Sequence, residues 1–260
     1  MPELVHTGRM MGARGGRFLP QTQALVAAMT TPPTDERAEL IDEFNRSMAA
    51  ISQASDWLFM LCAHAEQASL LDWTNPSRVL TPVNAPVFDA DEGYTGDAVG
   101  AYLTTSRLMS SLTKYQRNSA SATVAVVGAS PVASDRWLGP DGGSTTIFMG
   151  LSAGSEYSAR LNSNSGGTAA AVNGKGVYTI NRNNSSDFQM YKDGVQVASV
   201  TTASVILIAA NLILLSANGI YGVGPQAYGR VGSALTPTQI AAEAAAVKTF
   251  INGCNPGLLP

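Results

Sequence analysis

From residue 78 onward, the chain alternates between short apolar runs and turn-forming residues, and this pattern constrains the fold more than any other feature. Its clearest instance is Phe188–Val197, where two runs of alternating side chains flank the dipeptide Asp193-Gly194. Such a dipeptide is the strongest short-range signal for a β-hairpin. Further strands are expected at Val79–Val83, Tyr102–Thr105, Ala122–Ala129, Thr145–Leu151, Tyr157–Leu161, Gly176–Asn181, Leu212–Ser216 and Ala227–Val231. Many short strands at this spacing predict a β-sandwich or a barrel.

Charge is sparse along the chain. Charged residues make up 13% of the 260 residues, and the formal net charge is −3. A protein that binds duplex nucleic acid needs a basic stripe, so the composition argues against that class. The stretch 194–229 has no charged residue, and Val205–Ser216 within it is mostly apolar. Because a membrane-spanning helix needs roughly 20 apolar residues, this shorter run predicts two buried strands with a turn at Ala210-Asn211, and no membrane span.

The first part of the chain has a different character. Met1–Leu19 is rich in Gly and Arg and has no periodicity, so we expect an extended arm that lies on another subunit. Arg9, Arg14 and Arg17 would dock this arm on an acidic neighbour. Two helices are expected next, Gln21–Met29 and one that starts after the N-cap Thr34. The chain is therefore predicted to divide into an attachment segment, 1–54, and a β-domain, 55–260.

Two elements with clear boundaries follow from local signals. The apolar run Trp57–Ala63 predicts a buried strand, and a short helix is expected over Ala65–Trp73. At the C-terminal end, Thr236 and Gln239 form a capping box around Pro237, so a closing helix is predicted over 236–252. Gly253 is expected to stop this helix.

Several segments resemble known families. The hairpin FQMYKDGVQVAS, a further strand and the helix LTPTQIAAEAAAVKTFI resemble the end of a laminin-G or concanavalin-A-like jelly roll. The upstream segments resemble phage and prophage structural proteins that carry such a lectin-like domain; these segments are ALVAAMTTPPTDERAELIDEFNRSM, WLFMLCAHAEQASLLDW and LTPVNAPVFDADEGYTGDAVGAYLTT. The expected fold is thus a mainly β, concanavalin A/laminin-G-like jelly-roll sandwich with an N-terminal helical segment and a C-terminal helix.

The resemblance implies a function and a setting. It implies a non-enzymatic structural component of a bacteriophage virion, such as an appendage, spike, fibre or decoration protein, assembled in the host bacterial cytoplasm. Other virion proteins would be its partners, and self-association as a trimer follows by analogy with phage appendages. The alternative is a carbohydrate-binding module that recognises host surface glycans. A glycan-degrading enzyme on the same scaffold is the third hypothesis.

The sequence motifs that suggest catalysis lack the partner residues that catalysis requires. Gly150–Gly154 matches the pattern GxSxG, but a strand-like segment follows it and no histidine occurs after His64. It is therefore interpreted as a turn between strands. Asp89, Asp91 and Glu92 form an acidic cluster, which favours a solvated loop over calcium binding or glycoside hydrolysis. No catalytic residue, metal site or cofactor is predicted.

The remaining hypotheses concern single residues that could contact a ligand or a partner, or form a cross-link. Tyr221, Tyr228 and Asn183 are candidates for contact with a glycan or a partner, although core positions are the simpler interpretation of the tyrosines. Cys62 lies in an apolar run and should be buried. Cys254 is expected to be more exposed, in a flexible tail. Three states remain open for Cys254: a free thiol, a cross-link between subunits, and a bridge to Cys62.

Overall fold

The computed structural model describes residues 18–128, 135–142, 146–152, 156–170 and 174–260. Its helices are α1 (Pro20–Ala28), α2 (Asp35–Ser47), α3 (Ala49–Gln53), α4 (Glu66–Ser69) and α5 (Pro237–Cys254), with a 3₁₀ turn at Met109–Ser111. Most of the described chain between α3 and α5 forms antiparallel strands and their connections. Among the residues described, no helix combines the length and the apolar character needed to span a bilayer.

The strands form two packed sheets. The first sheet has the order β13-β12-β11-β6-β17-β4-β3, and β1 also pairs with β17. Its strands are β1 (Ser55–Met60), β3 (Val87–Asp89), β4 (Gly93–Thr95), β6 (Ala120–Val126), β11 (Gly176–Arg182), β12 (Asp187–Lys192), β13 (Val195–Thr201) and β17 (Gln226–Gly232). The second sheet has the order β10-β9-β8-β7-β14-β5-β2. Its strands are β2 (Thr81–Val83), β5 (Tyr102–Leu108), β7 (Arg136–Pro140), β8 (Ile147–Leu151), β9 (Tyr157–Leu161), β10 (Gly167–Ala169) and β14 (Asn211–Leu214).

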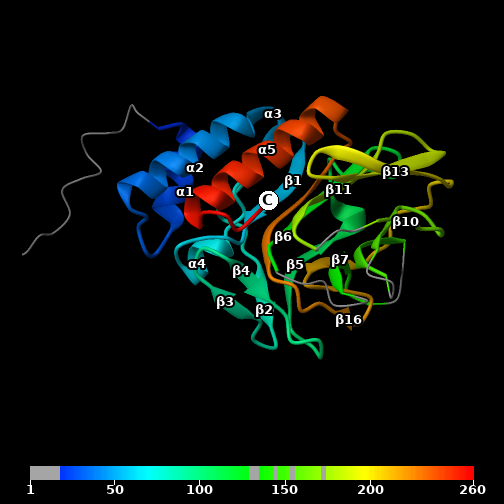
Figure 1. The fold of residues 1–260 in the computed structure, drawn as a ribbon, viewed down its shortest axis with the longest axis horizontal. Coiled ribbons are helices and arrows are strands. Elements are labelled where there is room, and N and C mark those ends of the chain that lie inside the picture. The colour runs from blue at the N-terminus through cyan, green and yellow to red at the C-terminus, as the bar shows by residue number, and fades with distance from the viewer. Residues whose placement is uncertain (1–17, 129–134, 143–145, 153–155, 171–173) are drawn as a thin grey trace, which may run out of the picture.

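The molecule has three layers, with the helices over the first sheet and the second sheet beneath it (Figure 1). One core cluster lies between the sheets and contains Trp137, Tyr157 and Tyr178, whose rings contact one another. A second cluster lies between the first sheet and helices α1, α2 and α5. The predicted β-sandwich with a closing helix is confirmed. The division of the chain at residue 54 stays a prediction.

A buried ion pair holds helix α5 on the first sheet. Arg230 of β17 donates from Nε to Oε1 of Glu243 at 2.6 Å, and neither side chain is exposed to solvent. Tyr228 and Thr123 donate hydroxyl hydrogen bonds to the same carboxylate, at 2.9 and 3.1 Å. Ser121 accepts a further bond from Arg230. The carboxylate is therefore the polar centre of the helix–sheet interface.

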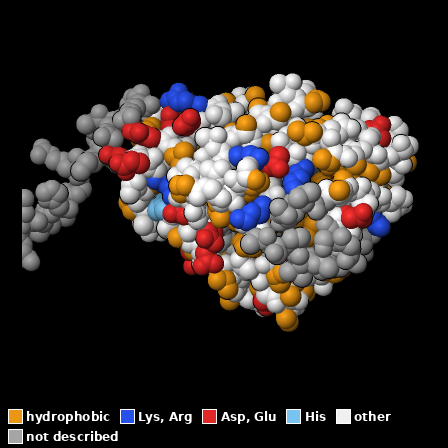
Figure 2. Space-filling view, viewed as in Figure 1, with side chains coloured by type: hydrophobic (Ala, Val, Ile, Leu, Met, Phe, Trp, Pro, Cys, Tyr) orange, Lys and Arg blue, Asp and Glu red, His pale blue; other side chains and the backbone are white. Residues whose placement is uncertain are grey.

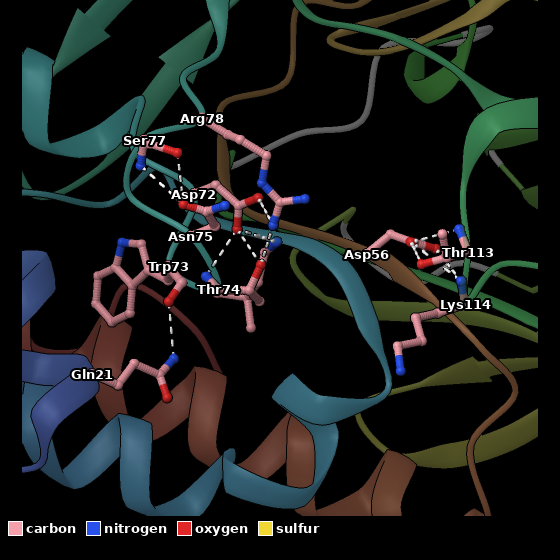
Figure 3. A network of polar contacts seen from close by, with 11 residues as sticks. Gln21, Asp56, Asp72, Trp73, Thr74, Asn75, Ser77, Arg78, Thr113 and Lys114 are labelled. Atoms are coloured by element: carbon pink, nitrogen blue, oxygen red, sulfur yellow. Dashed lines mark hydrogen bonds and ion pairs between the residues drawn. The ribbon is translucent and has the colours of Figure 1, made fainter.

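Two buried aspartates organise the segments around β1 (Figure 3). Asp56 accepts backbone N–H bonds from Thr113, Lys114 and Tyr115, which fixes the chain that leads into β6. Asp72 accepts bonds from Thr74 and pairs with Arg78 at 2.7 Å. Burial raises the pKa of Asp72, and the charge of Arg78 opposes that shift. In both segments the backbone N–H groups have no strand or helix partner among the described residues, and the carboxylates of Asp56 and Asp72 accept their hydrogen bonds instead.

Most local predictions are confirmed. The Asp193-Gly194 hairpin forms between β12 and β13, with φ values of 53° and 81° that suit a type I′ turn. Thr34 caps α2, and the capping box of Thr236 and Gln239 is present. The expected strand Trp57–Ala63 is β1, shifted by two to three residues.

Three predictions were wrong in detail. The stretch 205–210 forms no strand, and Ile206 is 79% exposed, so only the second of the two strands predicted there exists, as β14. Helix α5 continues past Gly253 to Cys254, because Gly253 packs against Leu40 of α2 within the helix. The tail after α5 is also docked: Asn252 and Leu259 exchange two hydrogen bonds, and Leu259 is buried.

Candidate ligand-binding surface

A small hairpin lies on the outer face of the second sheet, on the side away from the helices (Figure 1). It pairs β15 (Ser216–Ala217) with β16 (Ile220–Tyr221) through the turn Asn218-Gly219, whose φ values are 52° and 72°. Asn218 donates its N–H to the carbonyl of Pro140 in β7 at 3.0 Å. Only glycine fits at position 139, because a Cβ there would lie 2.3 Å from that of Ala217. Gly139 thus allows the hairpin to pack directly on β7.

The hairpin and strands β7 to β9 enclose a shallow hollow of about 180 Å³. In its floor, Phe148 of β8 is cross-strand neighbour to Arg160 of β9. The guanidinium carbons of Arg136 and Arg160 lie 4.8 and 5.6 Å from the centre of the Phe148 ring. The described lining consists of Arg136, Ile147, Phe148, Arg160, Ala217, Asn218 and Ile220. An aromatic ring, two guanidinium groups and a side-chain amide therefore converge on one hollow.

The electrostatics of the hollow favour an anion. Partial burial lowers the pKa of Arg136, the charge of Asp135 opposes this shift, and the like charge of Arg160 adds to it. Arginine stays protonated in proteins, so Arg136 keeps its positive charge despite this shift. A carboxylate, sulfate or phosphate that binds between two neighbouring guanidinium groups offsets their mutual repulsion and forms charge-assisted hydrogen bonds with them.

Asp135 supports the hollow from behind. Its carboxylate accepts N–H bonds from Val223 and Gly224 at 2.8 and 3.2 Å, and from the indole of Trp137 at 3.1 Å. Burial raises the pKa of Asp135, and these hydrogen bonds oppose the shift. Arg136 in turn donates from Nη1 to the carbonyl of Leu151. The loop after β16 and the stem of Arg136 are thus fixed by the same short segment at the start of β7.

Two tyrosines extend the aromatic surface beside the hairpin. Tyr221 follows Ile220 on β16, and its ring lies 6.2 Å from that of Tyr102 on β5 with an interplanar angle of 31°. Both side chains are half-buried. Tyr221 was a predicted contact residue, and the structure places it next to the hollow.

The structure does not gather the other predicted site residues here. Tyr228 is fully buried, and its hydroxyl donates to Glu243, so it occupies the core position that was the simpler interpretation. Asn183 is exposed in the turn between β11 and β12, in the other sheet, where it accepts a bond from Asn184. Arg9, Arg14 and Arg17 lie outside the described residues.

The acidic cluster is the turn between β3 and β4. Asp91 pairs there with Arg37 at 2.6 Å, and Asn255 contacts Glu92. In the part of the chain that the structure describes, no group of three or more His, Cys, Asp or Glu side chains is placed to hold a metal ion. Of the GxSxG match, Gly150 and Leu151 lie in β8 and the N–H of Ser152 donates to the carbonyl of Glu156 at 2.9 Å, while residues 153 and 154 lie outside the described residues.

A second hollow lies between helices α2 and α5. It has a volume of about 320 Å³ and is lined mainly by Leu40, Phe44, Phe250 and the alanines of α5. Acidic side chains gather at this end of the molecule, where α2 carries Asp35, Glu36, Glu39, Asp42 and Glu43 (Figure 2). A polar ligand would find few convergent groups in this apolar groove, so the hollow on the second sheet is the better candidate.

Comparison with known proteins defines the class of fold. No family model and no curated protein sequence matches the chain. Among solved structures, the binding domain of botulinum neurotoxin serotype D is similar, with a TM-score of 0.56, 10% identity, and coverage of 75% of this chain and 51% of that one. A mutant of Trypanosoma rangeli sialidase that displays trans-sialidase activity has a TM-score of 0.55 and 9% identity, over 82% of this chain and 39% of that one.

A third similar structure is that of botulinum neurotoxin type C, which enters cells in a manner dependent upon interaction with two ganglioside molecules. It has a TM-score of 0.54 and 11% identity, over 77% of this chain and 53% of that one. The chain thus spans about half the length of the neurotoxin chains that it resembles. The fold is a lectin-like β-sandwich, of the kind found in these binding domains. A similarity of fold at about 10% sequence identity defines the architecture only, so function has to be argued from the residues of the site.

Proposed function

We propose that this domain is a non-enzymatic carbohydrate-binding recognition module, and that it takes an acidic sugar in the hollow between β16 and strands β7 to β9. The observation that carries the proposal is the placement of two guanidinium groups, those of Arg136 and Arg160, over the ring of Phe148. This function is the one that the sequence analysis held as the alternative to a virion structural role.

Each group in the hollow can make a specific contact with an acidic sugar. The exposed part of the Phe148 ring offers an apolar surface for the C–H face of a sugar ring. The guanidinium groups of Arg136 and Arg160 supply positive charge beside the ring, which favours a carboxylate. The amide of Asn218, at the tip of the hairpin, can donate to and accept from sugar hydroxyls. The volume of about 180 Å³ suits a single terminal residue of a glycan rather than a long chain.

The similar structures support the proposal. Their names describe binding domains of neurotoxins, dependence on gangliosides in one case, and a sialidase in another. Gangliosides and sialidase substrates share sialic acid, a sugar that carries a carboxylate. The ligand class that the two arginines favour is therefore compatible with the ligands that the names of the neurotoxin type C and sialidase structures suggest.

We propose that the domain binds the sugar without hydrolysing it. Glycoside hydrolysis needs two carboxyl groups that face the scissile bond. The described residues that line the hollow include no Asp or Glu, and Asp135 is directed into the protein by its three hydrogen bonds. The hollow thus holds groups that position an anion and none of the acid–base pair.

The virion setting rests on the sequence resemblance alone. None of the similar structures named above is a virion protein. Display of the module on a phage particle, contact with other virion proteins and assembly as a trimer are proposals that follow from that resemblance. The apolar residues of the charge-free stretch 194–229 serve the chain's own core in large part, as Leu212, Leu214 and Leu215 show.

Binding to an array of immobilised glycans tests the proposal. We expect the protein to bind glycans that end in a sialic or uronic acid and to bind the matched neutral glycans much more weakly. Methyl esterification of the sugar carboxylates should abolish the signal. Phe148→Ala should weaken binding roughly tenfold because the stacking surface is lost, whereas Phe148→Leu should retain part of it. Equal binding before and after esterification would refute an acidic ligand.

A further inference from the structure

The chain contains two cysteines, and the fold brings them together from opposite ends of the sequence. Cys62 follows β1 and is fully buried, and its N–H donates to the carbonyl of Ala227 at 2.9 Å. Cys254 is the last residue of α5, is half-buried, and packs against the same core cluster. Both sulfurs contact one residue pair, Arg37 and Asp91. The expected difference in exposure between the two cysteines is confirmed.

An arginine and an aspartate complete the cluster. Arg37 of α2 donates from Nη1 to Sγ of Cys254 at 2.5 Å and from Nη2 to the carboxylate of Asp91 at 2.6 Å. The thiol of Cys62 donates to the backbone carbonyl of Asp91 at 3.0 Å. The Arg37 side chain is 13% exposed and that of Asp91 is 33% exposed, so the cluster reaches the surface at its Cys254 end.

We propose that Cys62 and Cys254 are a site of reversible oxidation, at which an intramolecular disulfide ties the end of helix α5 to the end of strand β1. The proposal is independent of the sugar-binding hollow, which lies on the other sheet. Each sulfur lies within one hydrogen bond of the Arg37–Asp91 pair, and a disulfide requires the two sulfurs to close to the bonded distance of about 2.05 Å. The docked tail and the turn between β3 and β4 hold both residues in place for that step.

The reaction with a small-molecule disulfide, RSSR, proceeds in two exchanges. The Cys254 thiolate, beside the Arg37 guanidinium, attacks one sulfur of RSSR; the S–S bond of the reagent breaks and RS⁻ leaves and takes up a proton. The product is a mixed disulfide on Cys254. Cys62 then loses its proton, its thiolate attacks the Cys254 sulfur, and the second RS⁻ leaves. Two protein thiols are oxidised and one RSSR is reduced to two RSH.

The cluster favours this order of events. The hydrogen bond with Cys254 raises the pKa of Cys62, and burial and the charges of Cys254 and Asp91 raise it further, while Arg37 opposes the shift. Cys62 is thus a poor first nucleophile. Once Cys254 is capped as a mixed disulfide, its sulfur cannot ionise, so the charge of Cys254 no longer contributes to the raised pKa of Cys62. Arg37 acts as a positioning residue for the first exchange.

The test equilibrates the full-length reduced protein with glutathione buffers of increasing oxidising strength and measures free thiols by alkylation under denaturing conditions. We expect both thiols to disappear together, the intact mass to fall by about 2 Da, and the protein to remain monomeric on a non-reducing gel. Peptide mapping should show the Cys62–Cys254 cross-link. The midpoint of thermal unfolding should rise by about 5 to 10 °C on oxidation, because the loop that closes is long.

Three results would overturn the proposal: two alkylated thiols at the oxidising end, a stable mixed disulfide on wild-type Cys254, or a dimer linked through Cys254. In Cys62→Ala, the mixed disulfide on Cys254 should accumulate because the second exchange is lost. If that variant does not fold, peptide mapping of the wild type still decides. Arg37→Gln should slow alkylation of Cys254 roughly tenfold, and Arg37→Lys, which keeps a positive charge beside the sulfur, should recover part of that rate, which a purely structural role for Arg37 would not do.

Discussion

Replacement of Glu243 by alanine should lower the free energy of unfolding by about 3 to 5 kcal/mol, which is a large part of the 5 to 15 kcal/mol typical of a folded domain. The variant leaves the guanidinium of Arg230 in the interior without its carboxylate partner, at 0% exposure. It also removes the acceptor for the hydroxyl groups of Tyr228 and Thr123. Urea unfolding, followed by fluorescence and circular dichroism, measures the change.

A surface variant on the same helix provides the control. Lys248 pairs with Asp193 at 3.2 Å, and both side chains are about a quarter exposed. Lys248→Ala should therefore cost no more than about 1 kcal/mol. The double variant Arg230→Met with Glu243→Leu should recover most of the lost stability, because it leaves no unpaired charge in the interface. A loss from Glu243→Ala as small as that from Lys248→Ala would show that the buried pair does not anchor the helix.

Removal of both positive charges from the hollow should weaken binding of an acidic glycan about 100-fold, which corresponds to about 2.7 kcal/mol. The variant is Arg136→Gln with Arg160→Gln, and titration calorimetry measures its affinity. Two charge-assisted hydrogen bonds of about 1.5 kcal/mol each account for a loss of this size. Binding of the matched neutral glycan, weak in the wild type, should not change.

The control for this variant removes the same charge from the helical layer. Arg46→Gln with Lys248→Gln changes α2 and α5, on the far side of the sandwich. It should leave affinity within about twofold of the wild type, because surface charges beyond a Debye length of about 10 Å are screened. Similar losses in both double variants would mean that net charge, rather than the hollow, determines binding.

Local chemistry accounts for what the sequence predicted well. The turn Asp193-Gly194, the N-cap Thr34 and the capping box at Thr236 depend on residues within four positions of one another. The strand expected over 205–210 did not form: this segment pairs with no described strand, so Leu207 and Ile208 pack on the edge of the core while Ile206 is exposed. Apolar composition predicts burial only where the fold supplies a surface to pack against.

The ligand-binding hollow was only partly predictable. Tyr221 was identified as an exposed aromatic candidate, but Arg136, Phe148 and Arg160 were not. Phe148 stands between the buried residues Ile147 and Met149, so the alternation of β8 already directed it to the opposite face. Which face meets solvent, and which strands lie beside it, depends on the pairing of distant segments. For Cys254, the sequence left a bridge to Cys62 open as one of three states, and it is the pairing of distant segments that places both cysteines in one cluster with Arg37 and Asp91.

Methyl NMR of the 27.0 kDa protein tests most directly whether the hollow binds an acidic sugar. Ile220 lines the hollow and is 42% exposed, while Ile240 and Ile251 lie on the buried face of helix α5. On titration with a sialylated oligosaccharide, the methyl signals of Ile220 should shift, and those of Ile240 and Ile251 should stay in place. Shifts confined to the helical layer, or none at saturating sugar, would contradict the account.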